Sequence, residues 1–183
     1  MKKLSQQKVV SRKDPEQMAS KVLMDNNITK APVPVEQIAV QLGATLQFEP
    51  FDGKDDVSAM LFRDHERTVI GVNSTHANTR QRFSIAHECG HLKLHKGKMY
   101  VDARINFRDT LSSLAVDPEE REANAFAAAL LMPGPFVIDE IKKAIEKNMS
   151  DDSDAIIGDL ARVFQVSMQA MTYRLKNLGL LVE

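Results

Sequence analysis

Residues 82–95 read RFSIAHECGHLKLH and contain an HExxH motif formed by His87, Glu88 and His91. The apolar spacing around the motif predicts a helix over residues 78–94. Histidines four positions apart on a helix differ by roughly 40° around its axis and about 6 Å along it, so their imidazoles can converge on one metal ion. The Glu88 carboxylate is close enough to reach a water on that ion without being a ligand. The motif therefore predicts a metal site beside a proton acceptor.

A third ligand is expected on a second element, because a catalytic zinc ion has three protein ligands and an open position for water. The next strongly predicted helix covers residues 118–131, with Asp117 as its cap and Pro118 in its first turn. Glu120 and Asn124 share one face of this helix. We therefore predict that Glu120 is the third ligand and that Asn124 binds a ligand histidine from behind.

Other polar residues near the two helices are expected to lie away from the metal. Glu119 is turned by about 100° from Glu120, and Glu122 by about 200°, which predicts that Glu122 faces solvent. The alternative for these three acids is capping and dipole complementation in the first turn of a helix. His95 lies roughly 12 Å along the axis from His87, too far to share one metal ion with both motif histidines. We predict a surface or helix-capping histidine there.

The rest of the chain predicts short helices and strands in one α+β fold, mainly helical, with a small antiparallel sheet. Turn residues and apolar periodicity locate the elements. The predicted elements are helices at residues 15–26 and 35–42, strands at 44–48, 57–62 and 68–72, a long loop at 96–118, and two or three helices after Pro133.

Composition excludes several classes of protein. The chain has 183 residues, is 43% hydrophobic and 27% charged, and carries a formal net charge of -1, so it can bury a core and is no general basic coat for nucleic acid. Its single cysteine fits a reducing compartment. The N-terminus lacks the apolar core of a signal peptide, and no apolar run is long enough to span a membrane. We expect a soluble, cytoplasmic protein.

Two segments resemble a known family. RFSIAHECGHLKLH at residues 82–95 resembles the helix of the ImmA/IrrE family of zinc metallo-endopeptidases, and EREANAFAAALLMP at 120–133 resembles its second signature. Residues 106–109 and 112–113 also resemble a stretch seen in many members. The similarity extends over roughly residues 15–180.

The resemblance implies a zincin-like fold of the gluzincin type, with one zinc ion per chain. His87, His91 and Glu120 would hold the metal, and Glu88 would be the general base of peptide hydrolysis. The implied substrate is a protein, a helix-turn-helix transcriptional repressor whose cleavage derepresses a mobile-element, phage or stress regulon. The alternative is a non-proteolytic module with a structural metal, which sequesters a repressor or toxin. An intact Glu88 favours the enzyme.

Substrate contacts are less well defined by the sequence. The strand at residues 57–62 is a candidate for binding an extended substrate by edge addition. Tyr100, Arg104 and Arg108 lie in the predicted loop at 96–118 and are candidates for oxyanion or substrate binding, with ordinary loop packing as the alternative.

The chain is expected to divide into a basic mobile tail at residues 1–13, a metallopeptidase domain at 14–150 and a C-terminal helical segment at 151–183 packed on the same domain. The last segment resembles a helix-turn-helix. Its second helix offers only Arg174 and Lys176 as bases, a poor footprint for phosphates. Helix packing or recognition of a protein partner is expected there, and direct DNA binding is not.

Overall fold

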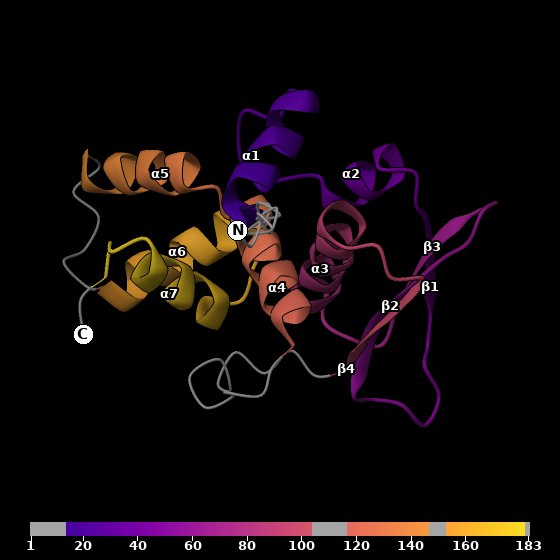
Figure 1. The fold of residues 1–183 in the computed structure, drawn as a ribbon. Coiled ribbons are helices and arrows are strands. Elements are labelled where there is room, and N and C mark those ends of the chain that lie inside the picture. The colour runs from indigo at the N-terminus through magenta and orange to yellow at the C-terminus, as the bar shows by residue number, and fades with distance from the viewer. Residues whose placement is uncertain (1–13, 104–116, 147–152, 182–183) are drawn as a thin grey trace, which may run out of the picture.

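The computed structural model describes residues 14–103, 117–146 and 153–181 (Figure 1). Helices dominate these residues and a small sheet lies at one side, so the predicted α+β class is confirmed. The helices are α1 (Pro15–Asp25), α2 (Val35–Gln41), α3 (Asn78–Leu94), α4 (Pro118–Leu131), α5 (Gly134–Glu146), α6 (Ser153–Phe164) and α7 (Met168–Asn177); the strands are β1 (Thr45–Glu49), β2 (Val57–Arg63), β3 (Thr68–Asn73) and β4 (Met99–Ala103).

The sheet has the strand order β1-β3-β2-β4 and is mixed. The predicted hairpin of β2 and β3 is present, and β4 is also antiparallel to β2. However, β1 lies beside β3 and runs parallel to it, so the sheet is not purely antiparallel as predicted. The reason is that β2 intervenes in sequence and reverses the chain direction before β3 returns to pair with β1.

Strand β2 lies in the middle of the sheet, paired on both sides, so the prediction that residues 57–62 offer an open edge to substrate was wrong. Its buried residues include the consecutive Val57, Ser58 and Ala59, a run typical of a strand covered on both faces. Among the described strands, β1 and β4 form the edges of the sheet.

Residues 99–103 form the edge strand β4, although the sequence predicts a loop from 96 to 118. Alternating exposure explains the strand: Met99 and Val101 are exposed and Asp102 is buried. The signal spans only five residues, which is too short to recognise beside irregular sequence. Arg104 and Arg108 lie outside the described residues.

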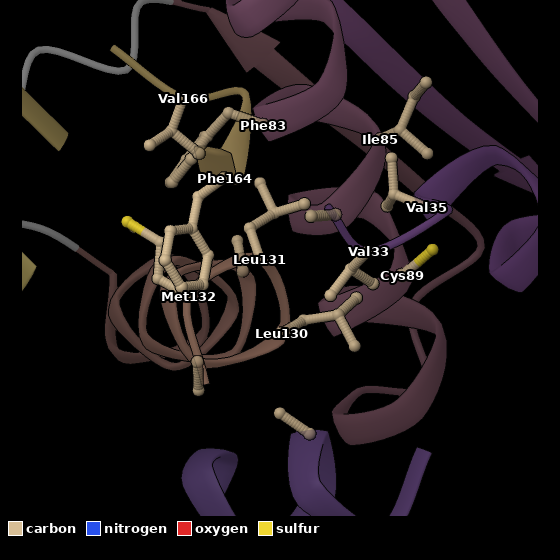
Figure 2. Packing of buried hydrophobic residues seen from close by; sticks show 14 of the residues in the cluster. Val33, Val35, Phe83, Ile85, Cys89, Leu130, Leu131, Met132, Phe164 and Val166 are labelled. Atoms are coloured by element: carbon tan, nitrogen blue, oxygen red, sulfur yellow. The ribbon is translucent and has the colours of Figure 1, made fainter. Parts of the chain in front are cut away.

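Helix α3 lies between the sheet and α4 (Figure 1). Every residue from 82 to 91 is buried. Leu130 and Leu131 of α4 and Phe164 of α6 belong to the same buried cluster as Phe83 and Cys89 of α3 (Figure 2). The HExxH segment therefore lies in the protein core, where each polar group needs a partner.

The backbones of α3 and α4 approach closely where Gly90 meets Ala123. A Cβ atom added to Gly90 would lie 3.0 Å from the Ala123 Cα and 3.1 Å from its carbonyl oxygen. A larger residue would require α3 and α4 to separate by a few tenths of an ångström, because backbone atoms cannot move aside as a side chain can. Gly90 is the motif position between Glu88 and His91, so this contact fixes the separation of the motif from α4.

The C-terminal helices pack against the same core. Leu160 of α6 and Met171 of α7 belong to the cluster that contains the α3 residues. Arg174 of α7 is buried, donates a hydrogen bond of 2.8 Å to the Met132 carbonyl and forms an ion pair with Glu16 of α1. This arginine is thus engaged in packing and is not available to a phosphate. No described helix is long and apolar enough to cross a membrane.

We predict that Gly90→Ala destabilises the protein, whereas Gly158→Ala does not. Both glycines lie inside helices, where alanine is favoured by at most about 1 kcal/mol. At Gly90 the overlap with Ala123 should outweigh this gain, because overpacking costs about 1–3 kcal/mol. At Gly158 the nearest atom would be 3.9 Å away, so the gain should remain. Urea denaturation of both variants tests this, and equal stability of the two would contradict the backbone contact.

Candidate metal centre

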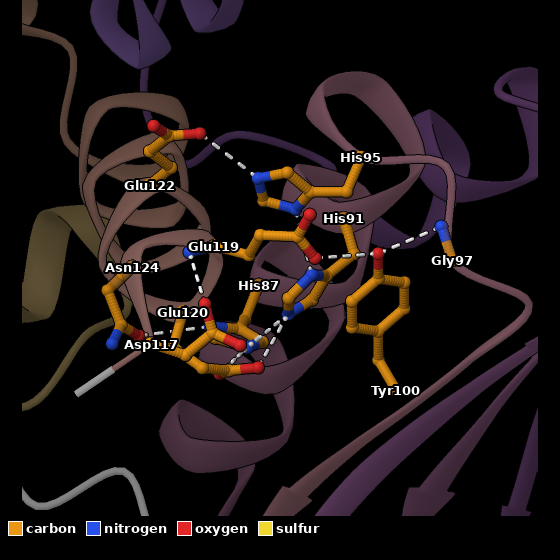
Figure 3. A network of polar contacts seen from close by, with 10 residues as sticks. All are labelled: His87, His91, His95, Gly97, Tyr100, Asp117, Glu119, Glu120, Glu122 and Asn124. Carbon is orange, nitrogen blue, oxygen red and sulfur yellow. Dashed lines mark hydrogen bonds and ion pairs between the residues drawn. The ribbon is translucent and has the colours of Figure 1, made fainter. Parts of the chain in front are cut away.

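Three side chains from α3 and α4 converge: His87, His91 and Glu120 (Figure 3). The Nε2 atoms of the two histidines lie 3.0 Å apart. Glu120 Oε2 lies 3.1 Å from His87 Nε2, and Glu120 Oε1 lies 3.4 Å from His91 Nε2. Ligands of a tetrahedral ion at about 2.0–2.1 Å lie about 3.3 Å from one another, so the spacing of these atoms suits one metal ion.

Asn124 lies behind His87, one turn along α4 from Glu120. Its Oδ1 atom lies 3.0 Å from His87 Nδ1. A carboxamide oxygen only accepts hydrogen bonds, so it favours the tautomer of His87 that carries its proton on Nδ1. That tautomer leaves the Nε2 lone pair directed at the cluster.

Glu88 lies beside the cluster with both carboxylate oxygens buried and without a hydrogen-bond partner among the described residues. Burial raises the pKa of Glu88 from its ordinary value of 4.5 to about 8; His87 opposes this rise, and Asp102 and Glu120 add to it. A carboxyl group with this pKa can accept and release a proton near neutral pH.

The pKa of Glu120 shifts in the opposite direction. Burial by itself would raise it, but hydrogen bonds with His87 and His91 hold the pKa of this carboxyl well below its usual range. Two carboxyl groups in one site are thus separated in proton affinity, an arrangement typical of acid–base sites. Glu120 is ionised and can act as a ligand, while Glu88 can carry a proton.

His95 is the helix-capping residue that one of the two predictions gives, but it is buried and not at the surface, and the prediction that Glu122 faces solvent was wrong. The His95 side chain is only 4% exposed, and its Nε2 atom lies 3.2 Å from Glu122 Oε2, whose side chain is 25% exposed. Its Nδ1 atom lies 3.0 Å from His91 Nδ1. His95 is the C-cap residue of α3 and has an extended backbone, so its ring does not follow the helical wheel. Glu122 reaches it because α3 and α4 pack so closely.

Tyr100 of β4 covers one face of His91. The two rings are stacked, with centroids 3.9 Å apart and planes inclined by 22°. Its hydroxyl donates a hydrogen bond of 2.9 Å to Glu119 Oε2 and accepts one of 2.9 Å from the Gly97 amide. The sequence indicates Tyr100 as an oxyanion or substrate candidate but does not indicate Glu119 as its partner.

Asp102, also on β4, is a buried carboxylate that sequence reasoning missed. It accepts a hydrogen bond of 3.2 Å from Ser84 Oγ of α3. Burial raises its pKa, while His87 and the Ser84 hydrogen bond oppose the rise. Its only signal in the sequence is an acid between two apolar residues, which a surface strand would show as well.

Comparison with known proteins agrees with this geometry. A model of the peptidase family described as the IrrE N-terminal-like domain matches residues 39–176. The chain belongs to this family. The chain is also 29% identical over 141 residues to the Radiation response metalloprotease IrrE of Deinococcus radiodurans; the match covers 73% of this chain and 37% of that protein. The predicted resemblance to the ImmA/IrrE family is thereby confirmed.

We predict that the metal-free protein loses stability as pH rises from about 5 to 9, and that Glu88→Gln reduces this loss. The folded pKa of Glu88, about 8, lies above its ordinary 4.5, so between these values the folded state binds more protons than the unfolded state. The contribution of Glu88 to stability must then fall with rising pH. Urea denaturation after chelation, at several pH values, measures both slopes. Identical slopes for the wild type and Glu88→Gln would contradict a buried, neutral Glu88.

Proposed function

We propose that the chain is a zinc-dependent metallo-endopeptidase that binds one zinc ion through His87, His91 and Glu120. The observation that carries this proposal is the position of Glu88, a buried carboxyl group without a partner among the described residues, next to that donor set. Two imidazoles and one carboxylate are a ligand set of catalytic zinc, and they leave a position open for water. A purely structural site would not need a base beside that position.

Each residue of the centre then has a distinct part in hydrolysis. Bound zinc would supply Lewis acidity, lowering the pKa of water and polarising the scissile carbonyl. Glu88 accepts a proton from the attacking water and returns it to the leaving nitrogen. Glu120 remains ionised throughout, and Asn124 keeps His87 in the tautomer that presents Nε2.

The outer edge of β4 is the place we propose for the substrate. This strand is an edge of the described sheet, and its Tyr100 ring lies against His91. An extended peptide added to β4 would form main-chain hydrogen bonds along the strand and would pass beside the metal centre. The central strand β2 cannot do this, because both its sides are paired.

For the substrate itself, we propose a helix-turn-helix transcriptional repressor in the cytoplasm, whose cleavage derepresses a mobile-element, phage or stress regulon. The resemblance to the ImmA/IrrE family supports this, as does a relative named for a radiation response. The chain spans 37% of that relative, so other parts of the relative have no counterpart in this match. The competing function is a non-proteolytic module that sequesters a repressor or toxin.

The C-terminal segment at residues 151–183 is proposed to be part of one folded unit with residues 14–150, and to contact the protein partner and not DNA. Its arginine Arg174 is held by Glu16 and the Met132 carbonyl. Exposed apolar side chains on α6 and α7, Val163 and Met168, suit contact with protein more than with phosphate.

We predict that His91→Ala and Glu120→Ala each lose zinc, whereas Glu140→Ala keeps it. Each of the first two changes removes one of the three proposed ligands. Glu140 on α5 is a suitable control, because its side chain is 27% exposed against 34% for Glu120 and it pairs only with a lysine one turn away among the contacts described. Metal analysis of the purified proteins measures this. Unchanged stoichiometry in both ligand variants would remove the proposed site.

We predict that Glu88→Gln keeps its zinc but loses cleavage by at least about 10²–10⁴-fold, the contribution of a general base. Glutamine preserves the size of the side chain and cannot take up a proton at neutral pH. The assay is co-expression with a candidate helix-turn-helix repressor, read by mass spectrometry of fragments and by a derepression reporter. Full derepression by Glu88→Gln with an intact repressor would favour the sequestering module over the protease.

A further inference from the structure

We propose that His95 and Glu122 act together as positioning residues that fix the tautomer and orientation of His91. This inference rests on the proposed function, because it takes His91 to be a metal ligand. The contacts form a chain: His91 Nδ1 lies 3.0 Å from His95 Nδ1, and His95 Nε2 lies 3.2 Å from Glu122 Oε2 (Figure 3). The chain begins at the buried ligand and ends at a carboxylate on α4 that is partly open to solvent.

Metal binding permits one arrangement of protons along this chain. If His91 uses Nε2 for the metal, its proton is on Nδ1, and it must donate to His95 Nδ1. His95 then accepts at Nδ1 and carries its own proton on Nε2, which donates to the Glu122 carboxylate. Every polar atom in the chain is thereby satisfied by one set of tautomers.

The two ligand histidines are consequently supported in different ways. His87 donates to a neutral amide oxygen of Asn124, whereas His91 donates to an imidazole that is polarised by a carboxylate. A carboxylate at the end of such a chain makes the ligand imidazole more basic and strengthens its bond to a metal. Tyr100 stacks on the face of the His91 ring. The stacking restricts tilting of this ring, while the contact with His95 restricts its rotation.

The position of His95 in the fold supports this role. It lies at the C-terminal end of α3, where the chain leaves the helix in an extended conformation toward β4. Arg63 of β2 donates a hydrogen bond of 2.7 Å to the His95 carbonyl and another of 2.6 Å to the Gly97 carbonyl. These bonds hold the backbone of the turn, so the imidazole of His95 keeps a fixed place between His91 and Glu122.

The test uses the full chain with His95→Phe and Glu122→Gln. Zn²⁺ affinity is measured by competition with a chromophoric chelator, and the visible spectrum of the Co²⁺-substituted protein reports the ligand geometry. We expect His95→Phe to weaken Zn²⁺ binding by about 10–100-fold and to shift the Co²⁺ spectrum, because the loss of such an outer partner costs this much. Glu122→Gln keeps a hydrogen-bond acceptor but loses the negative charge. Its Zn²⁺ affinity should therefore fall measurably, but less than that of His95→Phe.

Coupling between the variants separates positioning from a general structural effect. The double variant His95→Phe/Glu122→Gln should bind Zn²⁺ as His95→Phe does, because Glu122 acts on His91 only through His95. In contrast, Asn124→Ala acts on His87. In the double variant Asn124→Ala/His95→Phe, the fold-decreases in Zn²⁺ affinity of the two single variants should therefore multiply. If the fold-decreases in Zn²⁺ affinity of His95→Phe and Glu122→Gln multiply in the double variant, Glu122 does not act through His95, and the proposed series of contacts is overturned.

Wild-type affinity and an unshifted Co²⁺ spectrum in both single variants would overturn the positioning role and leave the proposed zinc site intact. Should His95→Phe fail to fold, Glu122→Gln decides the matter by itself, since its side chain is partly exposed. Failure of the proposed function has a different signature: the wild-type protein itself would bind no Zn²⁺, or would bind it as well after His91→Ala and Glu120→Ala.

Discussion

The contact between the backbones of α3 and α4 at Gly90 and Ala123 determines the geometry of the whole centre. Glu120 lies one turn before Ala123 on α4, and Gly90 lies between the two motif histidines. The separation of the helices at this point therefore sets the distance from the Glu120 carboxylate to the imidazoles. If α3 and α4 lay farther apart, the Glu120 carboxylate would move away from the two histidines. Asn124 and Glu122, on the same helix, would withdraw with it.

Burial of α3 on all sides explains why the centre contains so many specific partners. Over residues 82–91 the helix carries five charged or hydrogen-bonding side chains besides its cysteine, and burial without partners would cost each of them free energy. Arg82 bonds to the Val33 carbonyl, and Ser84 bonds to Asp102. The two histidines have Asn124 and His95 behind them and Glu120 between them. In contrast, neither carboxylate oxygen of Glu88 has a hydrogen-bond partner within the described residues.

Local signals are sufficient to predict the helices that carry the centre. The predicted helices at residues 78–94 and 118–131 have the bounds of α3 and α4, because periodicity, Asp117 and Pro118 act within a few residues. The convergence of the motif histidines also follows from one helix alone. Predicting the position of Glu120 also requires knowing which face of α4 is turned toward α3. The presence of Glu120 and Asn124 on one face indicates it.

What the sequence does not predict depends on contacts between distant segments. The pairing of β1 with β3 and the central place of β2 arise from sheet assembly, and no residue within these strands specifies a neighbour. The predictions for the side chains of His95 and Glu122 rest on helical wheels, which describe an isolated helix. His95 caps α3 as one of the predicted alternatives has it, but packing against α4 buries it, and the same close approach of the two helices covers Glu122.

Burial of these side chains also lowers the stability of the metal-free protein. Two imidazoles and the Glu120 carboxylate lie within 4.8 Å of one another, and the buried Glu88 carboxyl interacts electrostatically with His87 and Glu120, in a region where a buried charge is stable only when it is paired. The pKa values of Glu88 and Glu120 shift in opposite directions in the metal-free protein: Glu88 is raised and favours its protonated form, while Glu120 is lowered by the two imidazoles and stays ionised. A divalent cation at the donor set would neutralise Glu120 directly and lower the proton affinity of Glu88 nearby. Metal binding and the ionisation of Glu88 are therefore thermodynamically linked, so a cation in the centre would itself favour the ionised, proton-accepting form of Glu88 on which the proposed hydrolysis depends.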